Sequence, residues 1–303
     1  SEPYPLAPWI NKPAWADRSR EESDEMSSST RTEVELLEPG ELLPLWHVVA
    51  RNDAIDSGNP MHDDETARRL GFAGGLVPGV TLYGYLTHPL MAQLGEAFLA
   101  HGRFEVRFRR PVYEGEAVTA RVGVGRNDAG EQAFELELCN PSGEACVLGR
   151  AWIPATAPLA LAVPAPKTMP NPRIPATPEA LGTNPELGTL HECLAEDAGK
   201  AFASGLADDL ALYRAIVHPA WLLRQANLVV DRNIAVGPWI HVASDIEHCG
   251  VVGLNEPVAI HGRVTQVYAR KGNDFLDLEV LYVTSRPVMR VRHSLIYRVA
   301  APT

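Results

Sequence analysis

The chain has few of the residues that mark metal, redox or disulfide-rich proteins. Its 303 residues include four cysteines, Cys139, Cys146, Cys193 and Cys249. None forms the C-x-x-C pair that is typical of zinc and redox sites, and four are too few for a disulfide scaffold in a chain of this length. We therefore expect reduced thiols, no metal site and a cytoplasmic protein.

Positive charge and long apolar runs are also scarce. The chain has 27 Lys and Arg against 38 Asp and Glu, which gives a formal net charge of −11. This balance disfavours binding to nucleic acid or to an anionic membrane, because both need a basic surface. No apolar run reaches the roughly 20 residues that span a bilayer, and residues 1–15 lack the pattern of a secretory signal. We expect neither a membrane span nor a leader.

Two segments rich in proline divide the chain. Residues 1–30 are rich in Pro, Ser and charge, which predicts an N-terminal arm. Residues 154–188 contain nine prolines, a density that predicts a stiff, extended linker with neither helix nor strand pairing. The remaining parts, 31–153 and 189–303, are expected to be two folded units.

The two units show the same order of signals, which indicates an internal duplication. In the first unit a mainly apolar stretch predicts a helix over 76–99, and in the second the helix is predicted over 218–230. Segments with strand alternation follow each helix, at 103–109, 116–122, 134–138 and 145–153, and at 241–248, 256–260, 276–280 and 288–297. Each unit is expected to be an α+β fold in which an antiparallel sheet wraps one long helix, and the two sheets can join edge to edge.

The candidate functional residues lie just before the first predicted helix. The sequence Asn59-Pro60-Met61-His62 marks a turn, and residues 63–70 predict a short helix with an acidic first turn. Glycines then lead to Gly79 at the start of the long helix. Backbone N–H groups at a helix start lack partners within the helix, so they can face a developing oxyanion.

These residues resemble a known family. The run from Asn59 to His62, followed by Ala67, Gly71-Phe72 and Gly79, is similar to the motif of the MaoC-like (R)-specific enoyl-CoA hydratase and dehydratase family, and so is the segment 107–116. The resemblance implies a hotdog fold, and two units imply a double hotdog. It also implies an acyl thioester substrate that includes coenzyme A, no separate cofactor, and a homodimer.

The resemblance assigns roles around the turn. His62 corresponds to the family's acid–base histidine and Asn59 to its asparagine. In the family an aspartate lies two residues before that asparagine, but this chain has Ser57 there. The neighbouring Asp56 could supply the missing carboxylate through a local bulge, although adjacent side chains in extended chain point opposite ways. The predicted catalytic residues are therefore His62, Asp56 and Ser57.

The substrate is expected to contact the start of the helix. Gly79 corresponds to the family's glycine whose helix start stabilises the thioester enolate. Val80 and Tyr83 follow within about one turn and are candidate substrate-binding residues. Arg109, on a strand with alternating arginines, is a candidate contact for the phosphates of coenzyme A.

The serine at position 57 leaves three functions open. The first is a hydratase or dehydratase with His62 as its acid–base residue. The second keeps the fold but has altered chemistry, as a lyase, isomerase or thioesterase. The third is a non-catalytic protein that binds an acyl ligand. The second unit has no Asn-Pro-x-His motif, so we expect one site per chain and a degenerate second unit that shapes the acyl pocket.

Overall fold

The computed structural model of the chain describes residues 37–54, 57–156 and 161–300. The predicted arm, 1–30, and the candidate catalytic residue Asp56 lie outside the described residues. No helix in the described part is long and apolar enough to cross a membrane.

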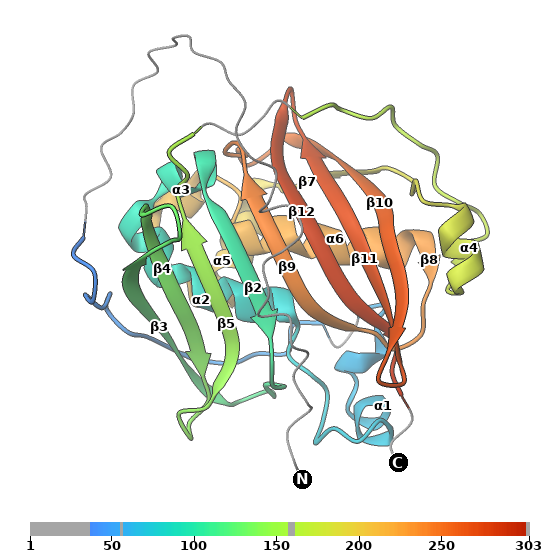
Figure 1. Cartoon of the computed structure of the whole chain (residues 1–303), viewed down its shortest axis with the longest axis horizontal. Coiled ribbons are helices and arrows are strands. Elements are labelled where there is room, and N and C mark those ends of the chain that lie inside the picture. Colours follow the sequence, from blue (N-terminus) through green and yellow to red (C-terminus); the bar gives the residue numbers. More distant parts are fainter. Residues whose placement is uncertain (1–36, 55–56, 157–160, 301–303) are drawn as a thin grey trace.

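A ten-stranded antiparallel sheet dominates the described structure (Figure 1). The first unit contributes, in spatial order, β1 (Trp46–Val49), β3 (Ala117–Arg126), β4 (Gln132–Cys139), β5 (Ala145–Trp152) and β2 (Arg103–Phe108). The second continues with β9 (Ile240–His248), β12 (Pro287–Arg298), β11 (Asn273–Val283), β10 (Pro257–Arg270) and β7 (Leu190–Cys193). The units join where β2 pairs with β9, with Phe104 opposite Ile246, so neither unit leaves an open edge there.

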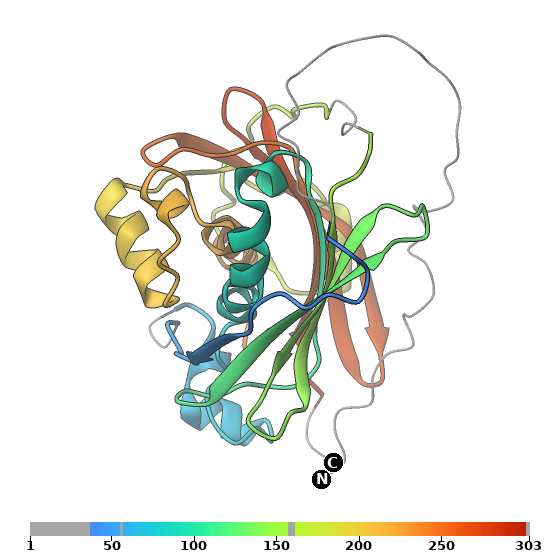
Figure 2. The same cartoon turned by 90° about the vertical axis from the view of Figure 1, so that its left-hand side faces the viewer.

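The two central helices, α2 (Gly79–Leu94) and α6 (Pro219–Asn233), lie on the same side of this sheet (Figure 2). Every residue from 80 to 91 is buried, as expected of a helix that a sheet wraps. The helices approach closely, because a Cβ on Gly84 would lie only 3.2 Å from the Cβ of Ala220. This double hotdog arrangement confirms the predicted α+β fold.

Shorter helices complete this layer of the fold. They are η1 (Pro60–His62), α1 (Asp64–Arg69), α3 (Glu96–His101), α5 (Glu196–Gly205) and η2 (Ala211–Arg214). The helix predicted over 76–99 is in fact two helices. Gly95 adopts a positive φ of 54° between α2 and α3, a conformation that glycine adopts at little cost and that ends the first helix.

The prediction that 154–188 forms neither helix nor strand pairing is wrong, because both occur in this segment. A short strand, β6 (Ile174–Pro175), pairs in parallel with β8 (Ile234–Ala235), and α4 (Pro178–Thr183) follows β6. The helix forms because the proline stands at its first turn, where its missing N–H costs nothing, and because the Thr177 side chain accepts from the N–H of Ala180.

Asn233, at the end of α6, fastens the chain after this segment to the core. Its fully buried side chain accepts from the Gly188 N–H at 2.6 Å and donates to the Gly188 carbonyl at 3.2 Å. Both backbone hydrogen-bonding groups of this residue are therefore satisfied by a single side-chain amide.

Replacing Asn233 with Ala is expected to lower the free energy of unfolding by about 1–3 kcal/mol, because it leaves buried backbone groups of Gly188 without partners. Urea denaturation measures the change as a lower midpoint. The control is Asn184→Ala, an exposed position at the end of α4. Equal midpoints for the two variants would contradict the prediction.

Several histidines of the central strands β9 and β12 are buried, and burial favours their neutral forms. His293 is fully buried and its Nδ1 lies 3.0 Å from the Ser244 hydroxyl. Burial lowers the pKa of His293 to about 3, and burial with the nearby charge of Arg103 lowers the pKa of His248 to about 3. The folded chain therefore resists protonation that the unfolded chain accepts.

We expect the free energy of unfolding to fall as the pH drops from about 6.5 toward 3. The unfolded chain binds protons on these histidines that the folded chain does not, and each such proton costs about 1.4 kcal/mol per pH unit. Urea unfolding at a series of pH values measures the slope. His293→Gln should reduce it, whereas His191→Gln, at an exposed position, should not. A stability independent of pH over this range would refute the expectation.

Candidate functional site

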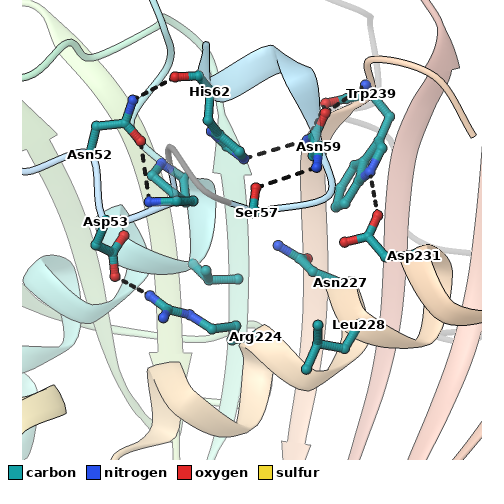
Figure 3. Close-up of a pocket in the computed structure, with 13 residues that line it drawn as sticks. Asn52, Asp53, Ser57, Asn59, His62, Arg224, Asn227, Leu228, Asp231 and Trp239 are labelled. Atoms are coloured by element: carbon teal, nitrogen blue, oxygen red, sulfur yellow. Dashed lines mark hydrogen bonds and ion pairs between the residues drawn. The ribbon is translucent and has the colours of Figure 1, made fainter.

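A pocket of about 480 Å³ lies where the loop before α2 faces α6 (Figure 3). The first unit lines it with Asn52, Asp53, Ala54, Ser57, Asn59, His62, Pro78 and Val80. The second unit lines it with Arg224, Asn227, Leu228, Asp231 and Trp239. Both units therefore build the site.

Asn59 connects the turn of the first unit to the second unit. Its side-chain oxygen accepts from the N–H of Met61 at 3.1 Å and of Trp239 at 3.2 Å, and its Nδ2 donates to the Trp239 carbonyl at 2.9 Å. The side chain is buried. Because its oxygen has two donors, the orientation of this amide is fixed, and Nδ2 is also directed toward Nε2 of His62 at 3.4 Å.

His62 is held as a neutral imidazole with one nitrogen facing the pocket. Its Nδ1 lies 2.7 Å from the Leu76 carbonyl oxygen, which can only accept, so Nδ1 carries the proton. Burial lowers the pKa of the ring, although the Leu76 hydrogen bond acts in the opposite sense. Nε2 is then a free base whose long contact with Asn59 engages it only weakly.

Two neighbouring contacts hold the backbone on either side of the His62 ring. The N–H of Leu76 donates to the Met61 carbonyl at 3.2 Å, and Nδ2 of Asn52 donates to the His62 carbonyl at 2.9 Å. Met61 packs with Ala67 and Leu76 in a small buried cluster. The short helix α1 and the turn at residues 59–62 thus fix the position of the His62 ring.

An ion pair crosses the pocket between the units. Asp53 accepts from the Thr81 hydroxyl at 2.7 Å through Oδ1 and pairs with Arg224 of α6 through Oδ2. The guanidinium also lies 4.8 Å from the centre of the Phe202 ring, a cation–π distance. The charge of Asp53 raises the pKa of His62, and the charge of Arg224 lowers it.

The start of α2 forms another wall. Pro78, the residue before the helix, makes no side-chain hydrogen bond that caps it. The first-turn N–H groups of Gly79 and Val80 are therefore left as donors. A Cβ on Gly79 would lie 2.9 Å from Nδ1 of His241 and 3.1 Å from the Phe108 ring. A side chain at position 79 would therefore collide with the rings of His241 and Phe108.

The structure brings together part of the predicted site. His62, Asn59, Ser57 and Val80 all line the pocket. Ser57 is exposed at the pocket, and its hydroxyl accepts from the N–H of Asn59 at 3.3 Å.

Three other predicted residues do not line this pocket. Gly79 lies beside it, between the lining residues Pro78 and Val80. Tyr83 is fully buried with its ring 5.0 Å from that of Phe104, so its place in the core argues against substrate contact. Arg109 follows β2, where its N–H donates to the Cys146 carbonyl.

Sequence reasoning missed the contribution of α6. Arg224, Asn227 and Asp231 are spaced three and four residues apart, which places them on one helix face, and this face lines the pocket. Asp231 accepts from Nε1 of Trp239 at 3.0 Å, and burial raises the pKa of its carboxyl. The sequence shows the spacing of these three residues, but it does not show that this face of α6 is directed toward the first unit.

Comparison with known proteins supports the fold. No protein-family model matches the chain, and no curated protein matches it. Among solved structures, it is similar to a candidate MaoC domain protein dehydratase from Chloroflexus aurantiacus, with 12% identity over 90% of this chain and 99% of that one, at a TM-score of 0.62.

Two further structures agree. One is a Mycobacterium tuberculosis protein with a double hotdog fold, at 15% identity and a TM-score of 0.57, covering 86% of this chain and 96% of that one. The other is a MaoC-like dehydratase, at 13% identity and a TM-score of 0.54, covering 86% and 98%. At such identities the likeness shows the double hotdog fold and transfers no reaction.

The two charges of the ion pair should move the pKa of His62 in opposite directions. Asp53→Asn is expected to lower it further, because a raising charge is lost, and Arg224→Met is expected to raise it. NMR titration of the His62 ring proton, assigned with His62→Gln, measures both. Arg232→Met, an exposed position on the same helix, is the control. Shifts of the same sign in both variants would overturn this description of the site.

Proposed function

We propose that the protein is a hydratase or dehydratase that adds water to, or removes it from, the β-carbon of an acyl thioester of the enoyl-CoA type. The observation that carries the proposal is the state of His62. Its Nδ1–H donates a hydrogen bond to the Leu76 carbonyl, and burial lowers the pKa of the ring. His62 lines a pocket beside a helix start, and its Nε2 is left as the basic nitrogen. A neutral imidazole placed in this way suits general-base catalysis.

The proposed hydration uses two features of the pocket. Nε2 of His62 takes a proton from a water molecule as the water oxygen bonds to the β-carbon. Negative charge then develops on the thioester oxygen, and the donors at the start of α2, beside Pro78 and Val80, can stabilise it. Dehydration follows the same path in reverse.

The reaction needs water and the thioester alone. Coenzyme A belongs to the substrate in this proposal, and no separate cofactor is required. Among the described residues, no three His, Cys, Asp or Glu side chains are grouped as a metal site would need. The cytoplasmic location and the homodimer stay predictions.

Replacing His62 with Ala should reduce kcat for hydration of short trans-2-enoyl-CoA substrates by about 10²–10⁴-fold, the usual contribution of one acid–base group. Loss of the conjugated absorbance measures turnover. His101→Ala, at an exposed position at the end of α3, is the matched control. Full activity in His62→Ala would contradict the mechanism.

The same assays distinguish the two alternative functions, a thioesterase and a non-catalytic acyl-binding protein. Release of free coenzyme A without hydration would indicate a thioesterase, which a thiol reagent detects. Binding of an acyl-CoA without any turnover would indicate a non-catalytic acyl-binding protein. Either result would replace the proposed hydratase.

A further inference from the structure

The proposed hydration includes two proton transfers, and a second acid–base group can share them with His62. When water adds to the double bond, one proton leaves the water and another must reach the α-carbon. His62 can serve one of these transfers. Ser57, at the position of the family's aspartate, has a neutral hydroxyl that cannot replace a carboxyl group in this role.

Among the described residues, two carboxylates line the pocket, those of Asp53 and Asp231. Asp53 is fully engaged, since one oxygen accepts from the Thr81 hydroxyl and the other pairs with Arg224. Asp53 is therefore better suited to holding the units together.

Asp231 has one oxygen available. In the described part of the chain only its Oδ1 has a hydrogen-bond partner, Nε1 of Trp239 at 3.0 Å. The Trp239 ring is buried, so this bond fixes the carboxyl group against a rigid wall. The view in Figure 3 shows the carboxyl group of Asp231 next to Asn227, within the set of residues that surrounds the pocket.

A series of contacts connects Asp231 to His62, and the longest of them is the one between His62 and Asn59. His62 contacts the Asn59 amide, and that amide holds both backbone groups of Trp239. The Trp239 indole in turn donates to Asp231. The base from the first unit and the carboxyl group from the second are thus held by one shared framework across the unit boundary.

We propose that Asp231 is the second acid–base residue of the reaction and exchanges a proton with the α-carbon, while His62 exchanges one with the β-oxygen. This inference rests on the proposed function. In hydration, His62 takes a proton from water as the carbon–oxygen bond forms, the π electrons move toward the thioester carbonyl, and Asp231 gives its proton to the α-carbon. The proton on His62 then returns to Asp231 through solvent, so the site is restored and one water is consumed.

The charged groups around Asp231 are compatible with this role. Burial is the largest influence and raises the pKa of Asp231, whereas the Trp239 N–H and the charges of Arg173 and Arg232 act against it. Burial likewise lowers the pKa of His62. Both shifts favour the neutral forms, a carboxylic acid and a free imidazole, that hydration requires at the outset.

The test compares Asp231→Asn with wild type in hydration of a short trans-2-enoyl-CoA, with kcat and KM measured across pH. Asn keeps an oxygen that can accept from Trp239 but cannot donate the required proton. We expect kcat to fall about 10²–10⁴-fold with KM changed little, and one limb of the pH profile to disappear. Asp209→Asn, at an exposed position, is the matched control, and Asp231→Glu should recover part of the activity.

The remaining outcomes are distinct. Wild-type turnover that Asp231→Asn retains would overturn this inference and leave the proposed function standing. Loss of activity in Asp56→Asn with Asp231→Asn unaffected would do the same and move the acid to residue 56. No turnover in folded wild type would overturn both. Urea denaturation shows whether Asp231→Asn is folded, and if it is not, Asp231→Glu decides through its pH profile.

Discussion

The amide of Asn59 holds the candidate site together. It joins the turn that carries His62 to the backbone of Trp239, 180 residues further along the chain, through two hydrogen bonds. Both partners are buried, so these bonds are formed where water cannot compete and where an unpaired group would be costly. This contact helps to fix the basic nitrogen of His62 relative to the wall that the second unit provides.

The contact between Asn59 and Trp239 forms because the strands of the two units belong to one continuous sheet. The pairing of β2 with β9 sets the position of every strand of the second unit against the first. Trp239 lies at the start of β9, and α6 packs against α2 on the same side of the sheet. The second unit lacks the Asn-Pro-x-His motif, but the joined sheet still places its helix against the pocket. A unit without the motif can therefore still take part in the site.

The sequence was sufficient for the parts of the fold that depend on local pattern. Alternation predicted β4 and β11 close to their centres, and the apolar stretch before Gly95 predicted α2. The helix α4 was not predicted, because proline density was read without regard to Pro178 standing at a helix start. The short strands β1 and β7 were also missed, since four residues give too little periodicity to recognise.

The residues of the site also divide into those that local sequence predicted and those that it did not. His62, Asn59 and Val80 could be placed from a contiguous motif, because a turn and a helix start bring near neighbours together. Arg224 and Asp231 could not, because they reach the pocket only through the long-range pairing of the units. The contact of Tyr83 with substrate stays a prediction, and the sequence did not place its ring for a related reason. Helical spacing puts it near Gly79 along the axis, but its ring packs with Phe104 in the core.

The same burial that makes the pocket possible also determines its chemistry. In water an imidazole and a carboxyl group would exchange a proton and become two charged groups. Here removal from water disfavours both charged forms, so the pKa of His62 falls and that of Asp231 rises. The permanent charges nearby, Asp53 and Arg224, neutralise each other. These shifts favour a neutral base and a neutral acid in the pocket, and the donors at the start of α2 are placed to meet the negative charge of an enolate.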